Sequence, residues 1–79
     1  MNGFHLARVQ RSFRRFNLVL RDASNRSVEP HREVSAAEFV TAFVAAHPAA
    51  RPYRPVLLAN AAGRRFIFRL SLWLSVARR

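Results

Sequence analysis

The middle of the chain contains the strongest local folding signal. Ser35 can cap a helix, and Glu38 lies three residues later, which completes a capping box in which each side chain bonds the other's backbone N–H. Pro48 closes the segment, because a proline pushes the residue before it out of the helical region. The pattern predicts a helix over residues 35–47.

This helix has one apolar face. Phe39 and Phe43 are four residues apart, with Ala42 and Ala46 beside them. Val34 precedes the cap and can pack against Phe39 at the positions of a hydrophobic staple. Such a face has to be covered by other elements, so we expect a small core around these two phenylalanines.

Alternation of side chains predicts a strand over residues 16–21, with Phe16, Leu18 and Leu20 on one face. Phe16 and Leu20 also share helical spacing with Phe13, so a helix remains the alternative. Residues 22–33 are polar and predict a loop.

The second half of the chain predicts a β-hairpin. After an extended connector at residues 49–55, the apolar residues 56–58 predict one strand and residues 65–70 predict the other. Phe66 and Phe68 should face the core, and Gly63 can adopt the positive φ that the intervening turn requires. Leu72 to Val76 continue as a strand or a short helix.

These elements predict an α/β protein, a small single domain with a βαββ core. The two strands joined through the helix should be parallel and the last two antiparallel. We divide the chain into a basic N-terminal arm, residues 1–15, and a domain, residues 16–79. A chain of 79 residues without cysteine has a marginal core and no disulfide to support it, so we expect it to depend on a partner.

Arginine dominates the charge. Fourteen basic residues, all arginine, face four acidic residues, which gives a net charge of +10. GC-rich codons explain the ratio of arginine to lysine equally well, but they do not explain the scarcity of acids. Self-repulsion at this charge is relieved by a polyanion, and guanidinium groups bind phosphate through two hydrogen bonds. RNA is therefore the expected partner.

Several of the arginines lie next to aromatic residues, an arrangement that can bind phosphate and stack on unpaired bases. Phe13 and Tyr53 could serve in such stacking or could lie in the core, and the sequence leaves both open. The candidate RNA-binding residues are Arg8, Arg11, Arg14, Arg15, Arg26, Arg64 and Arg65.

Residues 1–21 are rich in arginine, amphipathic and free of acids, as in a mitochondrial or plastid transit segment. The same residues could instead contact RNA in the mature protein or lie on an anionic membrane surface. The longest weakly charged apolar stretch, Leu70 to Ala77, is far shorter than the roughly 20 residues of a transmembrane helix.

Catalytic signatures are absent from the sequence. His5, His31 and His47 do not have metal-ligand spacing, and Gly3 and Gly63 do not form a phosphate-binding loop. We expect no enzymatic activity, no catalytic or metal site, no cofactor and no small-molecule substrate.

Residues 16–70 resemble a thioredoxin-like family that contains small mitochondrial ribosomal proteins and an accessory subunit of respiratory complex I. The resemblance is carried by Glu38-Phe39 at the helix start, by His47-Pro48, and by the segment from Leu58 to Arg65. The chain departs from the family at residues 31–35 and in its shortened C-terminal helix.

The resemblance implies a structural constituent of the mitochondrial ribosome, located in the matrix and bound to rRNA phosphates and neighbouring subunits. The alternative that it implies is an accessory structural subunit of a respiratory complex, similar to the one in complex I. The charge favours the ribosome, because a subunit docked by protein contacts alone does not need +10.

Overall fold

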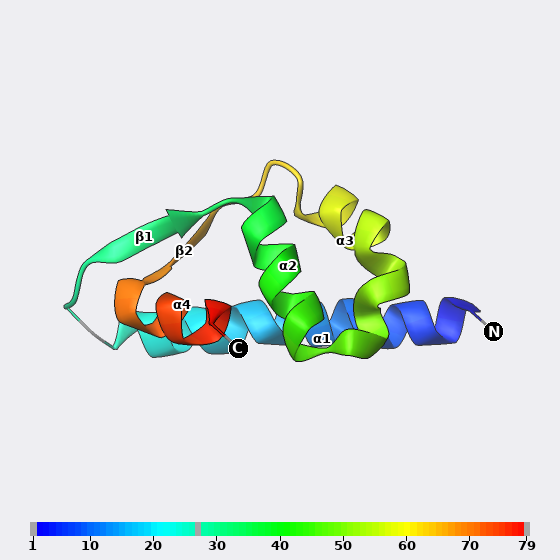
Figure 1. Cartoon of the computed structure of the whole chain (residues 1–79), viewed down its shortest axis with the longest axis horizontal. Coiled ribbons are helices and arrows are strands. Elements are labelled where there is room, and N and C mark those ends of the chain that lie inside the picture. Colours follow the sequence, from blue (N-terminus) through cyan, green and yellow to red (C-terminus); the bar gives the residue numbers. More distant parts are fainter. Residues whose placement is uncertain (1, 27, 79) are drawn as a thin grey trace.

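The computed structural model describes residues 2–26 and 28–78, with side chains described from residue 5 onward. This part of the chain is a small single domain with four α-helices and a two-stranded antiparallel sheet (Figure 1). The elements in chain order are α1 (Asn2–Asn25), β1 (His31–Val34), α2 (Ala36–Ala46), the 3₁₀ helix η1 (Pro48–Tyr53), α3 (Arg54–Ala61), β2 (Phe66–Arg69) and α4 (Leu70–Ala77). The expectation of one small domain that mixes helix and sheet is confirmed.

Helix α1 is the longest element and runs without a break across residues 15 and 16. The strand predicted over residues 16–21 is therefore wrong. A strand would bury Leu18 together with Leu20, but Leu18 is 54% exposed and Leu20 only 5% exposed. Burial instead follows the helical spacing of Phe13 and Leu20, which lie on the same side of α1.

The sheet pairs β1 with β2 in antiparallel orientation, with Val34 opposite Phe66 and His31 opposite Arg69. The loop predicted over residues 22–33 is wrong at both ends, because residues 22–25 belong to α1 and residues 31–33 belong to β1. The predicted hairpin and the predicted parallel pair are both wrong, because residues 56–58 belong to α3. Pro55 lies in the first turn of α3, where a proline loses no helical hydrogen bond.

Helix α2 is confirmed together with its cap. The Ser35 hydroxyl accepts a hydrogen bond from the Glu38 backbone N–H at 3.1 Å, and the Ser35 N–H donates to the Glu38 carboxylate at 3.3 Å. The helix ends at His47, whose backbone N–H donates to the Phe43 carbonyl at 2.8 Å. Pro48 then begins η1, so the extended connector expected at residues 49–55 is wrong.

The turn before β2 agrees with the sequence. Gly63 has a φ of +78°, a conformation that glycine adopts without strain. Strand β2 follows with Phe66 and Phe68 buried and Ile67 exposed, as the alternation predicted. Helix α4 covers residues 72–76, for which a helix was one of the two alternatives, and it begins at Leu70, which was predicted to end the strand.

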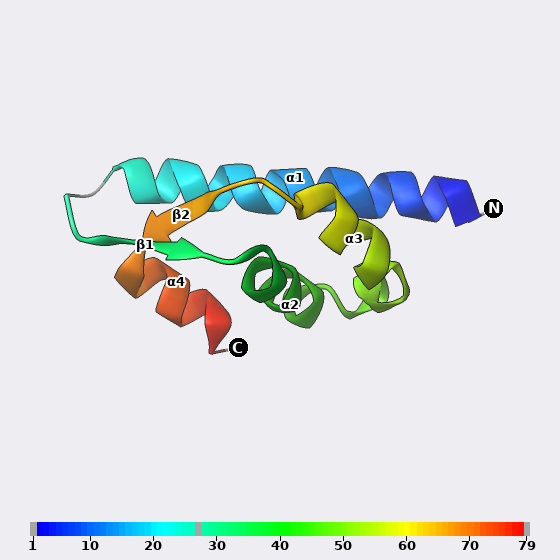
Figure 2. The ribbon, with the colours of Figure 1, turned by 90° about the horizontal axis from the view of Figure 1, so that it is seen from above.

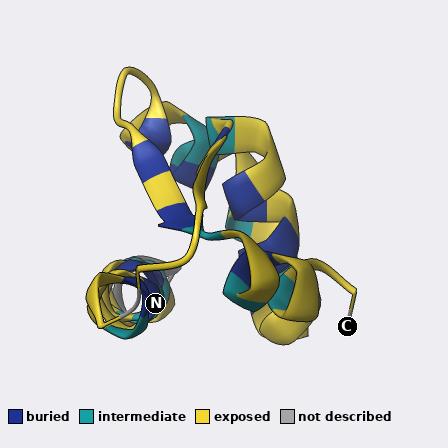
Figure 3. Ribbon diagram, turned by 90° about the vertical axis from the view of Figure 1, so that its left-hand side faces the viewer, coloured by how far each residue is buried: buried dark blue, intermediate teal, exposed yellow. Residues whose placement is uncertain are grey.

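Aromatic side chains from four elements meet in the core. Phe39 is fully buried and stacks on Phe66 with 4.3 Å between ring centroids, while Phe13 of α1 meets its edge at 5.2 Å. Trp73 of α4 stacks on Phe68 at 5.7 Å. Figure 3 looks along α1 and shows buried residues both on α1 and on the elements that lie beside it. Helix α1 is therefore part of the core.

Helix α1 packs against β2 and η1, and α2 packs against α3. Figure 2 shows α1 and the loop between α3 and β2 on one side of the molecule, and α2 and α4 on the other. This arrangement leaves one flank of α1 beside β2 and the loop that precedes it.

Candidate nucleic-acid interface

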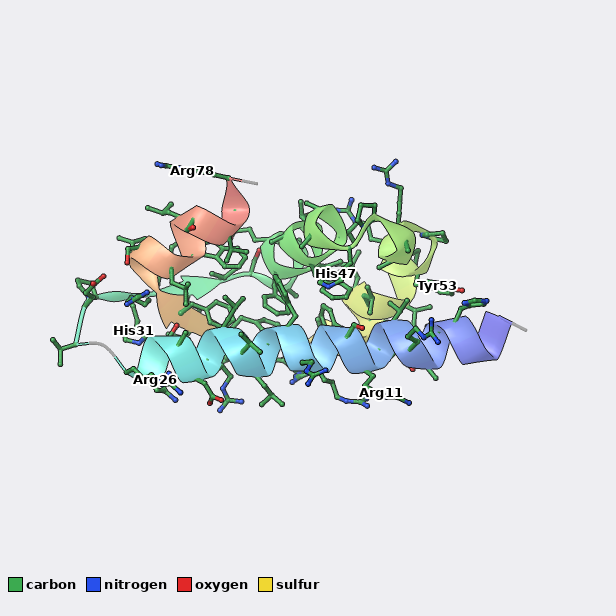
Figure 4. All side chains as sticks on the ribbon, turned by 90° about the horizontal axis from the view of Figure 1, so that it is seen from below. Arg11, Arg26, His31, His47, Tyr53 and Arg78 are labelled. Atoms are coloured by element: carbon green, nitrogen blue, oxygen red, sulfur yellow. The ribbon has the colours of Figure 1, made fainter. Side chains whose placement is uncertain are left out.

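The side chains of α1 fall into three groups around the helix axis. Phe13 and Leu20 point into the core. Arg14 and Arg21 are seven residues apart, so two helical turns bring them to the same flank. Arg11 and Arg26 project away from the other helices (Figure 4).

A polar groove of about 510 Å³ lies between α1 and the start of β2. Its volume is within the range of small-molecule and cofactor sites. One wall of the groove is formed by α1. The other wall is formed by β1, β2 and the loop before β2. Together the two walls contain three arginines and one histidine. The lining residues are Asn17, Arg21, Asn25, His31, Arg64, Arg65 and Ile67.

A second, separate hollow of about 310 Å³ lies nearer the N-terminal half of α1. It is lined by Gln10, Phe13, Arg14, Asn60 and Arg64. Arg64 lines both hollows. Arg21 shares the groove with Arg64, and Arg14 shares the second hollow with Arg64.

The arginines around these two hollows differ in how far their charge is already neutralised. Arg65 donates from Nε to the Glu33 carboxylate at 3.2 Å, although both side chains are largely exposed. Arg64 lies over the ring of Phe66 at 5.7 Å, a cation–π contact that leaves its charge uncompensated. Within the described residues, no carboxylate forms an ion pair with Arg14 or Arg21. The groove therefore carries an excess of positive charge.

Asn17 forms part of the groove lining and is only 6% exposed. Its side-chain oxygen, Oδ1, is buried and has no hydrogen-bond partner within the described chain. Buried polar atoms are nearly always paired, so this acceptor is an exception that needs an explanation.

The structure places three of the seven predicted RNA-binding residues on these two hollows: Arg64 and Arg65 line the groove, and Arg14 and Arg64 line the second hollow. It does not bring the other four to the groove. Arg11 and Arg26 both lie along the edge of α1 that points away from the other helices (Figure 4). Arg15 lies on the opposite flank of α1, in a shallow hollow that includes His47.

Arg8 is exposed near the N-terminal end of α1. Phe13 is 3% exposed, so it is a core residue and is not free to stack on a base. Tyr53 is half-buried at the end of η1. His47 caps the C-terminus of α2, with its Nδ1 3.3 Å from the Phe43 carbonyl oxygen.

The sequence-based list missed Asn17 and Arg21. A helical projection of α1 centred on Phe13 and Leu20 places both beside the apolar stripe, where a neighbouring element can meet them. That signal was present, but the prediction of a strand from residue 16 concealed it.

Neither a metal site nor a membrane span is found among residues 2–26 and 28–78. No group of three histidine or acidic side chains there could hold a metal ion. No helix in these ranges is both long enough and apolar enough to cross a membrane.

Comparisons with protein-family models, with curated proteins and with solved structures found no match to this chain.

Proposed function

We propose that this protein is a structural, non-enzymatic RNA-binding subunit of the mitochondrial ribosome, located in the matrix. The observation that carries the proposal is the position of Arg14 and Arg21 on two hollows that share Arg64, with no carboxylate partner for these arginines among the described residues. Like charges on facing walls repel, and phosphate groups between them convert that repulsion into attraction. Guanidinium groups also match the geometry of phosphate oxygens.

The segments that resemble the thioredoxin-like family of mitochondrial ribosomal proteins add support. The capped helix α2 and strand β2 lie within these segments, whereas the strands that the resemblance requires at residues 16–21 and 56–58 are helical. We therefore propose a thioredoxin-like ancestry from the short sequence motifs alone, because the arrangement of the strands does not support it.

The proposed matrix location rests on residues 1–21, whose arginines and amphipathic character are typical of targeting segments. Phe13 and Leu20 of this segment lie in the core, so its removal would open the core. We therefore propose that any targeting signal in α1 is retained in the folded protein.

An accessory structural subunit of a respiratory complex is the second candidate. Leu18 and Val19 are 54% and 60% exposed on the outer side of α1, next to Arg15. Adjacent exposed apolar residues favour contact with a protein neighbour. Such a contact is compatible with either assembly, because a ribosomal subunit also touches other proteins.

Two measurements test the proposal. The tagged protein is purified from cells, and the associated rRNA and respiratory subunits are quantified; rRNA is expected in stoichiometric amount. RNA affinity is then measured against salt concentration. About four phosphate contacts predict a log–log slope of roughly −3 to −3.5.

Arg64→Ala should reduce the magnitude of that slope by a little under about one unit for unrelated RNA sequences. Arg51→Ala is the matched control, because Arg51 is exposed and lies outside the groove. Copurification with respiratory subunits instead of rRNA would support the second candidate.

A further inference from the structure

The groove between α1 and β2 contains one side chain whose charge depends on pH. His31, the first residue of β1, lines it together with Arg21, Arg64 and Arg65, and all four side chains are exposed. The buried Oδ1 of Asn17 is closed to a ligand, so contacts with a bound molecule must come from the exposed lining. Histidine ordinarily changes its charge between about pH 5 and pH 8, whereas arginine stays charged throughout that range. Among the lining residues, only His31 can therefore make the charge of the groove vary with pH.

One hydrogen bond determines which nitrogen of the His31 ring is left for a ligand. Nδ1 lies 2.9 Å from the backbone carbonyl oxygen of Glu29. A carbonyl oxygen only accepts, so Nδ1 must carry a hydrogen in the neutral ring as well as in the charged one. Nε2 of the neutral ring is then an acceptor, and it has no partner among the described residues. A phosphate oxygen is an acceptor too, so the neutral ring cannot donate to it from Nε2.

Uptake of a proton reverses the role of Nε2. The imidazolium carries a hydrogen on each nitrogen, so Nε2 becomes a donor while Nδ1 keeps its bond to the Glu29 carbonyl. A hydrogen bond from a charged donor to a phosphate oxygen is roughly twice as strong as one between neutral groups. His31 can therefore contact phosphate only in its charged form.

The cationic groups around His31 come from three other segments of the chain. The ring lies beside the C-terminal end of α1 (Figure 4). The neighbouring cations are Arg21 of α1, Arg64 and Arg65 of the loop before β2, and Arg69, which lies opposite His31 in the strand register. Like charges so close together disfavour a further proton on the ring, and an anion among them favours it.

The acids near His31 do not supply that negative charge inside the groove. Among the described residues that line the groove, none is acidic. The Glu29 carboxylate accepts a hydrogen bond from the Ser71 hydroxyl at 2.8 Å, and the Glu33 carboxylate pairs with Arg65. A bound phosphate is therefore the group that compensates a charged His31, so phosphate binding and proton uptake each favour the other.

We propose that His31 is a phosphate contact in this groove and that RNA binding is coupled to the uptake of a proton by its ring. Arg21, Arg64 and Arg65 attract the phosphates at every pH, and the charged Nε2 of His31 adds a hydrogen bond. Since the anion binds the charged ring better than the neutral one, RNA affinity rises as the pH falls. The inference rests on the proposed RNA-binding function and adds the dependence of that function on pH.

The test uses the full chain and a fluorescent oligouridine, whose phosphates and bases keep their charge between about pH 6 and pH 8. Anisotropy titrations at one fixed ionic strength should give about three- to tenfold tighter binding at the lower pH, the size expected for one hydrogen bond. Calorimetry at about pH 7, in two buffers with different heats of ionisation, should show the uptake of about half a proton on binding.

Two substitutions assign the effect to His31. His31→Gln has no titrating ring and should bind RNA equally at the two pH values. His31→Arg is charged at both, so it should also lose the pH dependence and bind at least as tightly as the wild type does at the lower pH. His5→Gln is the matched control, because His5 is an exposed histidine on α1 that lies outside the groove. It should keep the pH dependence of the wild type.

Equal RNA affinity of the wild-type protein at the two pH values, or binding without proton uptake, would overturn the inference and leave the proposed function standing. A pH dependence that persists undiminished in either His31 variant would also overturn it, because another group would then be responsible. The wild-type measurements and His31→Arg keep the inference testable even if His31→Gln does not fold. Absence of RNA binding at both pH values would defeat the proposed function itself.

Discussion

Phe39 is the residue whose truncation should damage the fold most. Its side chain is fully buried and contacts rings from α1, β2 and α4, including Phe13, Phe66 and Trp73. Truncation of a buried phenylalanine to alanine costs about 3–5 kcal/mol, and aromatic contacts on several sides place Phe39→Ala near the upper end. A domain of 79 residues has a total stability of roughly 4–12 kcal/mol. The variant should therefore lose much or all of its folded population.

The assay is urea denaturation followed by the fluorescence of Trp73, the single tryptophan, which is 2% exposed and stacks on Phe68. Sodium sulfate in all samples keeps the variant measurable, because it strengthens apolar burial and screens the arginines. Ile67→Ala is the control, since Ile67 is 42% exposed on the other face of β2 and should change stability by about 0.5 kcal/mol. If the free energy of unfolding of Phe39→Ala lies within about 1 kcal/mol of the wild-type value, the packing of α1 and β2 on α2 is refuted.

Three further substitutions test local features. Ser35→Ala removes the N-cap of α2 and should cost about 1 kcal/mol, so an unchanged thermal midpoint would contradict the cap. Gly63→Ala should lower the stability by about 1–2 kcal/mol through backbone strain alone, because no atom lies within 4 Å of the added methyl group. Gly63→Asn should lower it less, and equal losses of stability would argue against the positive φ. Glu33→Gln breaks an exposed ion pair with Arg65, so stability should change by less than about 1 kcal/mol, whereas RNA affinity should rise; unchanged affinity would place Arg65 outside the RNA contact.

The sequence predicted correctly the elements whose signals are local. The cap of α2 depends on Ser35 and Glu38, three residues apart, and both hydrogen bonds of the box are present. The alternation of Phe66 and Phe68 in β2 likewise needs no information from elsewhere in the chain. Gly63 was placed by the same kind of signal, because positive φ is a property of one residue.

The errors arose where short apolar stretches fit two periodicities. Leu18 and Leu20 alternate like a strand, but only the rest of the core shows that Leu18 faces away from it. Leu57 belongs to an apolar triplet that resembled a buried strand, and Pro55 in the first helical turn was interpreted as a break. Pairing of β1 with β2 joins residues more than thirty positions apart, so no local pattern contains it.

The sequence could predict which kind of residue forms the candidate interface, but not where on the molecule the interface lies. Arg14 and Arg64 were both named from the sequence, yet their position around a common hollow depends on how α1 packs against β2. Helical spacing places Asn17 beside the apolar stripe of α1, but the sequence does not show that burial leaves its side-chain oxygen without a partner.

The pairing of distant strands also determines when the protein can fold during synthesis. Val34 meets Phe66, and the Ser24 hydroxyl accepts a hydrogen bond from the Arg69 backbone N–H at 2.9 Å. Contacts of such long range form late, because the intervening chain must be present before its ends can meet. Since chains emerge N-terminus first, α1 precedes every partner that covers its apolar stripe. Until Arg69 has been synthesised, the nascent chain should remain unfolded, with the basic amphipathic segment of α1 uncovered. In this unfolded state a chain can be bound by chaperones or threaded through a channel.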